Sequence, residues 1–162
     1  MRLLGAAARK EASAYFTGGA SAVLMGWRAA TIDVDVAFVP DSDDLLRALP
    51  DLKEQLELNV ELASPSDFLP ELPGWKGRSV FVAREGKVSF FHYDFYAQAL
   101  AKIERGHAQD RLDVRSMLDA GLVVPITLRE LLDAIVPELY RYPAVDPAAL
   151  RRAVVEALTG RT

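Results

Sequence analysis

The sequence contains no cysteine and only two histidines, His92 and His107, among its 162 residues. The absence of cysteine excludes a disulfide framework and a cysteine-based zinc site, and two histidines cannot build a multi-histidine metal centre. No apolar run is long enough to span a bilayer, and the first residues lack the charged-then-apolar pattern of a secretory signal. These absences predict a cytoplasmic protein with no membrane partner.

An excess of basic charge is also missing, since 19 Lys and Arg face 23 Asp and Glu, for a net charge of −4. A protein of this charge is not a nucleic-acid binder of the basic-stripe kind. The length predicts a single domain that buries about two-thirds of the surface of its unfolded chain. Any RNA contact would depend on a local group of cations: Lys76, Arg78, Arg84, Arg105, Arg111 and Arg115.

Hydrophobic periodicity divides the chain into a mixed first part and a helical second part. In the first part we expect helices at 2–14, 20–27 and 42–56, the last interrupted near Pro50, and strands at 15–17, 31–39 and 57–63. A Pro/Gly-rich loop over 68–77 precedes a predicted hairpin of 79–83 and 87–93.

After Asp94 the pattern is helical throughout. Asp94 can cap a helix over 95–105, a second helix is expected over 109–120, and Thr127–Glu130 forms a capping box for a third. Asp146-Pro147 has the N-cap and first-turn residues of a last helix, which Gly160 ends. We therefore predict an α+β fold, with a mixed sheet and helices over residues 1–93 and a helical region over 94–162 packed on it as one domain.

Two short motifs carry the chemistry. Gly18-Gly19 ends a strand and opens a helix, which lets the backbone and free N–H groups approach an anion closely. After a spacer of thirteen residues, Asp33 and Asp35 alternate on one strand and project from the same face, with Ile32, Val34 and Val36 expected in the core. Paired carboxylates suit Mg²⁺ together with substrate phosphates, so the motifs indicate phosphoryl or nucleotidyl transfer.

A third acidic residue lies on the following strand. Glu61 stands between Val60 and Leu62 and would complete a cluster of three carboxylates if this strand neighbours the Asp33 strand. Glu57 and Asn59 share its face by parity, so the spacing alone does not choose among the three.

This series of motifs resembles the nucleotidyltransferase superfamily, the fold shared by polymerase β and the small bacterial minimal nucleotidyltransferases. The resemblance rests on Gly18-Gly19, Asp33-Val34-Asp35-Val36 and Val60-Glu61-Leu62. It departs from the superfamily pattern in having Glu61 where Asp is usual, and Gly18-Gly19 in place of Gly-Ser, although Ser21 could supply the hydroxyl.

The resemblance implies nucleotidyl transfer from an NTP with Mg²⁺ or Mn²⁺ held by Asp33, Asp35 and Glu61, which are the catalytic candidates. It implies triphosphate binding by Gly18, Gly19 and Ser21. The acceptor would be RNA, notably the 3′ end of tRNA, and the biological setting a toxin–antitoxin pair with a cognate partner protein. Two alternatives remain: adenylylation of a partner protein, and a non-catalytic binding module that kept the fold.

Lys102 is a further candidate for catalysis and nucleotide binding. Ala99-Leu100-Ala101-Lys102, followed by Asp110 and Asp113, resembles a motif of abortive-infection-type nucleotidyltransferase toxins in which a helical lysine faces the nucleotide. The alternative is an ordinary solvated helix with an exposed Lys102. Trp75 could stack on a base or fill the edge of a core, and His92 is expected to be a structural histidine.

Overall fold

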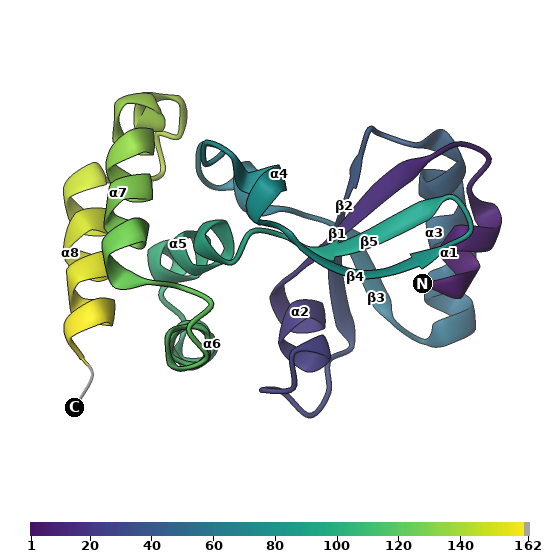
Figure 1. The fold of residues 1–162 in the computed structure, drawn as a ribbon, viewed down its shortest axis with the longest axis horizontal. Coiled ribbons are helices and arrows are strands. Elements are labelled where there is room, and N and C mark those ends of the chain that lie inside the picture. The colour runs from purple at the N-terminus through teal and green to yellow at the C-terminus, as the bar shows by residue number, and fades with distance from the viewer. Residues whose placement is uncertain (161–162) are drawn as a thin grey trace. The chain divides into compact units, whose positions relative to one another are not determined.

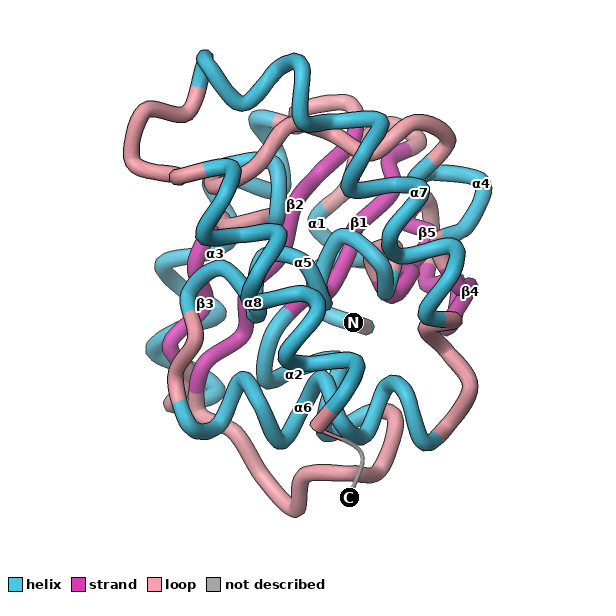
Figure 2. Tube along the Cα trace, turned by 90° about the vertical axis from the view of Figure 1, so that its left-hand side faces the viewer, coloured by secondary structure: helices cyan, strands magenta, loops and turns pink. Residues whose placement is uncertain are grey.

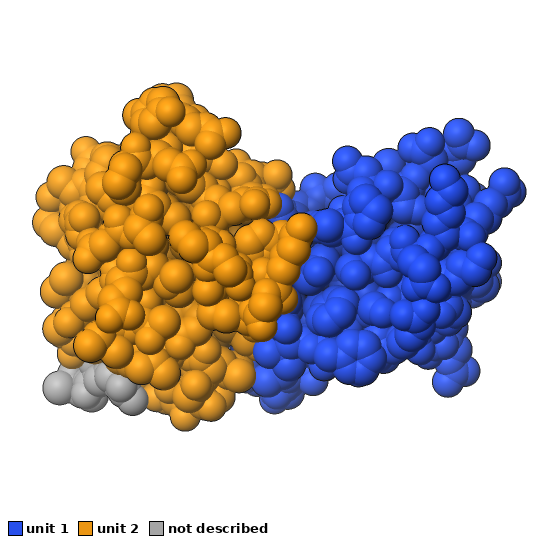
Figure 3. All heavy atoms as spheres, turned by 45° about the horizontal axis from the view of Figure 1, so that its top comes forward, with its two compact units in different colours: residues 1–64, 79–93 blue, residues 65–78, 94–162 orange. Residues whose placement is uncertain are grey.

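The computed structural model describes residues 1–160, which divide into two compact units. The first unit comprises Met1–Ser64 and Ser79–Tyr93, and the second comprises Pro65–Arg78 and the chain from Asp94 onward (Figure 3). The Pro/Gly-rich segment therefore belongs with the C-terminal helices, although strands of the first unit flank it in sequence. The predicted single-domain organisation stays a prediction.

A five-stranded mixed sheet forms the first unit (Figure 1). Its strands are β1 (Ala12–Thr17), β2 (Asp33–Val39), β3 (Asn59–Leu62), β4 (Val80–Glu85) and β5 (Val88–His92), in the order β3-β2-β1-β5-β4. The pairs β1–β2 and β4–β5 are antiparallel, whereas β1–β5 and β2–β3 are parallel. This sheet and its flanking helices confirm the predicted α+β class.

Three helices, α1 (Arg2–Ala7), α2 (Gly18–Leu24) and α3 (Asp43–Leu56), complete the first unit. Its core is built from alternate residues of the strands, such as Ala14, Phe16 and Val36, together with Leu45 and Leu49 of α3. The predicted helix over 2–14 was therefore wrong in its second half. Ala12 and Ala14 lie in β1 because pairing with strands on both sides outweighs the helical propensity of alanine.

Helix α1 lies directly against the turn between β4 and β5. A Cβ atom on Gly5 would stand 2.4 Å from the carbonyl oxygen of Glu85, and one on Gly86 would stand 2.6 Å from that of Gly5. Gly86 also has a φ of +56°, which glycine adopts without strain. Glycine at both positions is thus required by close backbone contact.

Helix α3 runs without interruption through Pro50, so the predicted break is absent. The Ser42 hydroxyl caps it by accepting from the backbone N–H of Leu45. Proline removes one backbone hydrogen bond of the helix, but buried Leu45, Leu49 and Leu52 hold its inner face against the sheet.

The second unit is helical (Figures 1 and 2). It contains α4 (Trp75–Arg78), α5 (Phe95–Arg105), α6 (Ala108–Asp119), α7 (Pro125–Ile135) and α8 (Pro147–Thr159), with the short 3-10 segments η1 (Pro65–Asp67) and η2 (Val136–Arg141). Helix α5 is central, because α6, α7 and α8 all pack against it. None of the helices that the structure describes is both long and apolar enough to cross a membrane.

The predicted caps in this unit were right at two helices and wrong at one. Asp94 accepts from the N–H of Tyr96 at the start of α5, and Asp146 accepts from Ala149 at the start of α8. Helix α7 instead begins at Pro125, so Thr127 lies inside it and caps nothing. Proline at the first helical position fixed this start three residues earlier than the capping-box pattern predicts.

Candidate active site

The acidic side chains of β2 and β3 lie on one face of the sheet. The parallel register places Asp35 beside Glu61 and Asp33 beside Asn59. The Asn59 amide nitrogen donates to Asp33 Oδ1 and to Glu61 Oε1, each at 3.1 Å, so these two carboxylates share a face. Asp35, two residues along β2 from Asp33, projects from the same face.

The register resolves the choice among Glu57, Asn59 and Glu61. Glu57 lies outside β3, at the C-terminal cap of α3 with a φ of 53°. The Asn59 amide lies between the carboxylates of Asp33 and Glu61. Because it donates to both, it partly offsets the repulsion between them. Glu61 is therefore the acidic residue that stands next to Asp35 in the sheet.

One residue next to this strand differs from its prediction. Ile32 is 69% exposed, whereas Val34 is half-buried and Val36 is fully buried. The strand begins only at Asp33, so the alternation of faces does not extend back to Ile32.

Gly18 brings the glycine turn against Asp35. A Cβ atom on Gly18 would stand 2.4 Å from Asp35 Oδ2, and the residue has a φ of +58°. Any other residue here would meet both backbone strain and a clash with the carboxylate. The two sequence motifs thus meet at one point, which the antiparallel pairing of Thr17 with Asp35 fixes.

Gly19 is packed just as tightly on its other side. Its Cβ position lies 2.5 Å from Thr31 Oγ1 and 3.4 Å from an Nη1 of Arg28. Thr31 in turn donates to the Asp33 carbonyl at 3.0 Å and accepts from the Asp33 N–H at 3.2 Å. Thr31 therefore links the glycine turn to the start of the acidic strand.

Arg28 is the residue that sequence reasoning missed. It is half-buried, and its guanidinium approaches Gly19. A signal was present, because Arg28 is the only cation between Gly19 and Asp33 in the sequence. Its position after the end of α2 hid it, since no helical or strand periodicity relates it to the glycines.

Ser21 does not present its hydroxyl to a ligand. The side chain is fully buried and its hydroxyl donates to the carbonyl of Phe16 at 3.0 Å, while His92 Nδ1 lies 3.0 Å from Ser21 Oγ. Since the single hydroxyl proton goes to Phe16, Nδ1 carries the proton that His92 donates to Ser21. Burial lowers the pKa of His92. This geometry does not support the phosphate-binding role predicted for Ser21, and it gives His92 the expected structural one.

Lys102 lies in the second unit, within a buried group of charges. Its ammonium is 2.6 Å from Asp113 Oδ2 and 3.4 Å from Asp110 Oδ1, and all three residues are at most 5% exposed. Arg105 also binds Asp110 through two hydrogen bonds. The solvated alternative for Lys102 was therefore wrong, and the geometry shows the lysine held by aspartates of α6.

The pKa of Asp110 reflects two opposing effects. Burial alone raises the pKa of this carboxyl, but the hydrogen bonds and charges of Arg105 and Lys102 outweigh burial and hold the pKa below its ordinary value. Lys102 and Arg105 balance the charges of Asp113 and Asp110, and of these four side chains only that of Arg105 is exposed, at 54%.

The six cations proposed as an RNA-contacting rim are largely engaged elsewhere. Ion pairs hold four of them: Arg78 with Asp94, Arg84 with Glu11, Arg105 with Asp110 and Arg115 with Asp119. Lys76 lies over the ring of Trp75 at 5.5 Å, and that tryptophan is itself only 6% exposed. Trp75 thus fills the core of the second unit.

The donor set of the sheet suits a hard divalent cation. Asp33, Asp35 and Glu61 offer carboxylate oxygens only, which Mg²⁺ and Mn²⁺ prefer. Within residues 1–160, however, no three acidic or histidine side chains are gathered closely enough to hold one metal ion. The carboxylate oxygens of Asp33, Asp35 and Glu61 are suitable metal ligands, but these side chains have to move closer to one another to bind one ion.

The mixed sheet brings a glycine turn against a strand with alternating aspartates. This arrangement defines the class of nucleotidyl-transferring proteins that the sequence motifs resemble. Over residues 4–144 the chain matches the family model described as nucleotidyltransferase of unknown function (DUF6036), and it belongs to that family. The chain is thus a nucleotidyltransferase, a class that generally uses a divalent metal and an NTP. No curated protein and no solved structure matches it.

Proposed function

We propose that this protein transfers a nucleotidyl group from an NTP to an acceptor hydroxyl, with Asp33, Asp35 and Glu61 as its acidic centre. The observation that carries the proposal is the contact of the Asp35 carboxylate with Gly18, which unites the two motifs. Family membership supports the reaction class.

The glycine turn and Arg28 are proposed to bind the triphosphate. Gly18, which is half-buried, brings the backbone of the turn against the Asp35 carboxylate, so a phosphate bound near Asp35 would lie beside this backbone. The Arg28 guanidinium, next to Gly19, has the planar array of donors that pairs with phosphate oxygens. Triphosphate binding, which the sequence analysis predicts for Ser21, is therefore assigned to Arg28 in this proposal.

The strands position the carboxylates. Asp35 lies on β2 between β1 and β3, so strands on both sides fix its backbone, and Asn59 holds Asp33 and Glu61 on the same face. These residues would hold the divalent ion, which when bound neutralises phosphate charge and lowers the pKa of the acceptor hydroxyl. Lys102 is left a structural role in this proposal, because Asp113 and Asp110 hold its ammonium.

Two acceptors are considered. RNA, including the 3′ end of tRNA, is the acceptor that the resemblance implies, in the setting of a toxin–antitoxin pair. A protein hydroxyl is favoured by one observation, namely that carboxylates already pair with Arg78, Arg84, Arg105 and Arg115. Each such pair weakens the phosphate contacts on which RNA binding depends.

The first test is nucleotide binding. We expect calorimetry to show binding of at least one of ATP, CTP, GTP and UTP that requires Mg²⁺ or Mn²⁺. Asp35→Asn keeps the shape of the side chain but removes its charge, and should weaken binding roughly ten-fold, as loss of a charged contact does. Asp51→Asn, on the exposed side of α3, is the matched control and should bind as the wild type does. If none of the four nucleotides binds at millimolar concentration, the proposed transfer is contradicted and the alternative of a non-catalytic binding module is favoured.

The second test identifies the acceptor. Wild-type protein and Asp33→Ala are incubated with labelled NTPs and either total RNA or lysate protein. Label that enters RNA only with the wild type would support the RNA acceptor, and label that enters protein alone would establish protein modification. Label in neither, despite nucleotide binding, would contradict transfer to both acceptor classes.

A further inference from the structure

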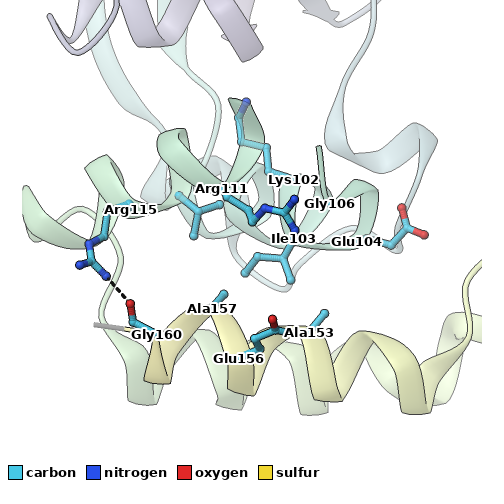
Figure 4. Close-up of a pocket in the computed structure, with 11 residues that line it drawn as sticks. Lys102, Ile103, Glu104, Gly106, Arg111, Arg115, Ala153, Glu156, Ala157 and Gly160 are labelled. Atoms are coloured by element: carbon cyan, nitrogen blue, oxygen red, sulfur yellow. Dashed lines mark hydrogen bonds between the residues drawn. The ribbon is translucent and has the colours of Figure 1, made fainter. Parts of the chain in front are cut away.

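The second unit contains a cavity of about 500 Å³ between α5, α6 and α8 (Figure 4). Packed protein interiors leave few voids larger than a water molecule, whereas ligand pockets occupy roughly 300–1,000 Å³. The cavity is therefore of the size of a small-molecule site. It lies wholly within the second unit and involves none of the acidic residues of the sheet.

Small residues on α8 and at its C-cap, Gly160, leave this space open. Ala153, Ala157 and Gly160 follow one another at helical spacing along the wall of the cavity, opposite Ile103 of α5 and Val114 of α6. A larger side chain on α8 would fill the gap between the helices. The walls are consequently mostly apolar.

Two of the three cations at the cavity are already engaged. The Lys102 ammonium binds Asp113 and Asp110. Arg115 donates to the Gly160 carbonyl at 2.9 Å and lies 3.6 Å from Asp119. Neither supplies an available charge.

Arg111 is different. Its side chain is exposed and forms no ion pair or hydrogen bond within residues 1–160. Figure 4 shows its guanidinium beside Ile103, while the Glu104 carboxylate points away from α8. A guanidinium whose donors meet no partner among residues 1–160, next to an apolar hollow, matches a ligand that has an anionic head and an apolar body.

We propose that this cavity binds a small organic monoanion, a carboxylate with an apolar chain or ring, whose head group pairs with Arg111. The apolar walls formed by Ile103, Val114, Ala153 and Ala157 would receive its body. Glu156 also lines the cavity and repels additional negative charge, so a monoanion is favoured over a phosphate dianion or a triphosphate. The site is thus distinct in its chemistry from the one proposed for the NTP.

The test is calorimetric titration of the full chain with octanoate, and with 1-octanol, octylammonium and octyl phosphate for comparison. We expect octanoate to bind one to one, octyl phosphate and octanol to bind more weakly, and octylammonium not to bind. Arg111→Gln should weaken octanoate binding roughly 10- to 100-fold, as loss of a charge-assisted hydrogen bond does. Arg152→Gln, an exposed arginine of α8 outside the cavity, is the matched control and should bind octanoate normally.

A second variant tests the cavity itself. Ala157→Leu fills the hollow but keeps Arg111, and should abolish octanoate binding with an unchanged circular dichroism spectrum. Asp35→Asn should bind octanoate as the wild type does, which separates this site from nucleotide binding. No octanoate binding at millimolar concentration, equal binding by Arg111→Gln, or equal binding of octylammonium would each overturn the proposal.

Discussion

At the scale of single residues, the pair of Ser21 and His92 links α2 to the sheet. Ser21 accepts from His92 Nδ1, and burial lowers the pKa of the imidazole. The folded protein therefore holds His92 neutral at a pH where the unfolded chain would protonate it. Since the unfolded state then binds more protons, the contribution of His92 to the free energy of unfolding is lost as the pH decreases below about 6.5.

His92→Asn should remove this part of the pH dependence. The asparagine amide can occupy the place of Nδ1 and donate to Ser21, but it does not titrate. We expect the variant to be less stable than the wild type at pH 8, and the difference to narrow as the pH falls to 5. Urea unfolding at a series of pH values measures both quantities.

The chain has only one other histidine, which serves as the control. His107 is exposed at the start of α6 and its side chain makes no cap hydrogen bond. His107→Asn should leave the slope between pH 8 and 5 as in the wild type. An unchanged slope in His92→Asn would show that another group titrates.

The same residues show what the sequence can and cannot predict. Asp33 and Asp35 were placed on one face because strand parity is a local property, although their roles remain predictions. The place of Glu61 beside them depends on the pairing of β2 with β3, which the sequence analysis left as a condition. Ser21 and Lys102 were assigned to a ligand because the motifs around them resemble those of nucleotidyltransferases. Their actual partners, Phe16, His92, Asp110 and Asp113, come from other elements, and no local pattern reveals such pairing.

At the scale of elements, the position of α1 depends on Gly5. Alanine normally stabilises a helix relative to glycine by roughly 0.5–1 kcal/mol. A Cβ on Gly5, however, would meet the backbone of Glu85 at 2.4 Å, and backbone cannot rotate away. We expect Gly5→Ala to lower the free energy of unfolding by about 1–3 kcal/mol, as overpacking does.

Gly77→Ala is the matched control for this prediction. Gly77 is also in a short helix, α4, and nothing lies within 4 Å of its Cβ position. This variant should be as stable as the wild type or more stable by up to about 1 kcal/mol. If both variants shift the urea midpoint alike, the contact between α1 and the β4–β5 turn is not specific.

Element boundaries were predictable where a local signal decides them. The starts of α5 and α8 follow from Asp94 and Asp146, which cap their own helices. Strand β1 was underestimated because Ala12 and Ala14 are held by β2 and β5, and their alanine content gives no hint of that pairing.

At the scale of the whole molecule, the chain passes three times between the two units, after Ser64, Arg78 and Tyr93. No sequence signal marked Pro65–Arg78 as part of the second unit, because its Pro/Gly content predicts a loop and not the unit to which the loop belongs. Each unit contains one of the two tryptophans, Trp27 in the first unit and Trp75 in the second.

Single-tryptophan variants can therefore follow each unit separately. Trp75→Phe leaves Trp27 as the reporter of the first unit, and Trp27→Phe leaves Trp75 as the reporter of the second. Because strands of the first unit hold both ends of Pro65–Arg78, we expect loss of one unit to release the other. In each variant, the urea midpoint from fluorescence should equal that from circular dichroism. Midpoints that differ within one variant would show two independent domains.

The parallel pairing of β1 with β5 has a consequence for synthesis on the ribosome. Ala12 of β1 lies beside Val88 of β5, so the centre of the sheet closes only when most of the first unit has left the exit tunnel. Until then one side of β1 offers unpaired backbone groups, which favour association between nascent chains. The helices that follow Tyr93 begin to emerge only after this interval, so α1–α3 are the helices of the first unit that can cover the sheet until then.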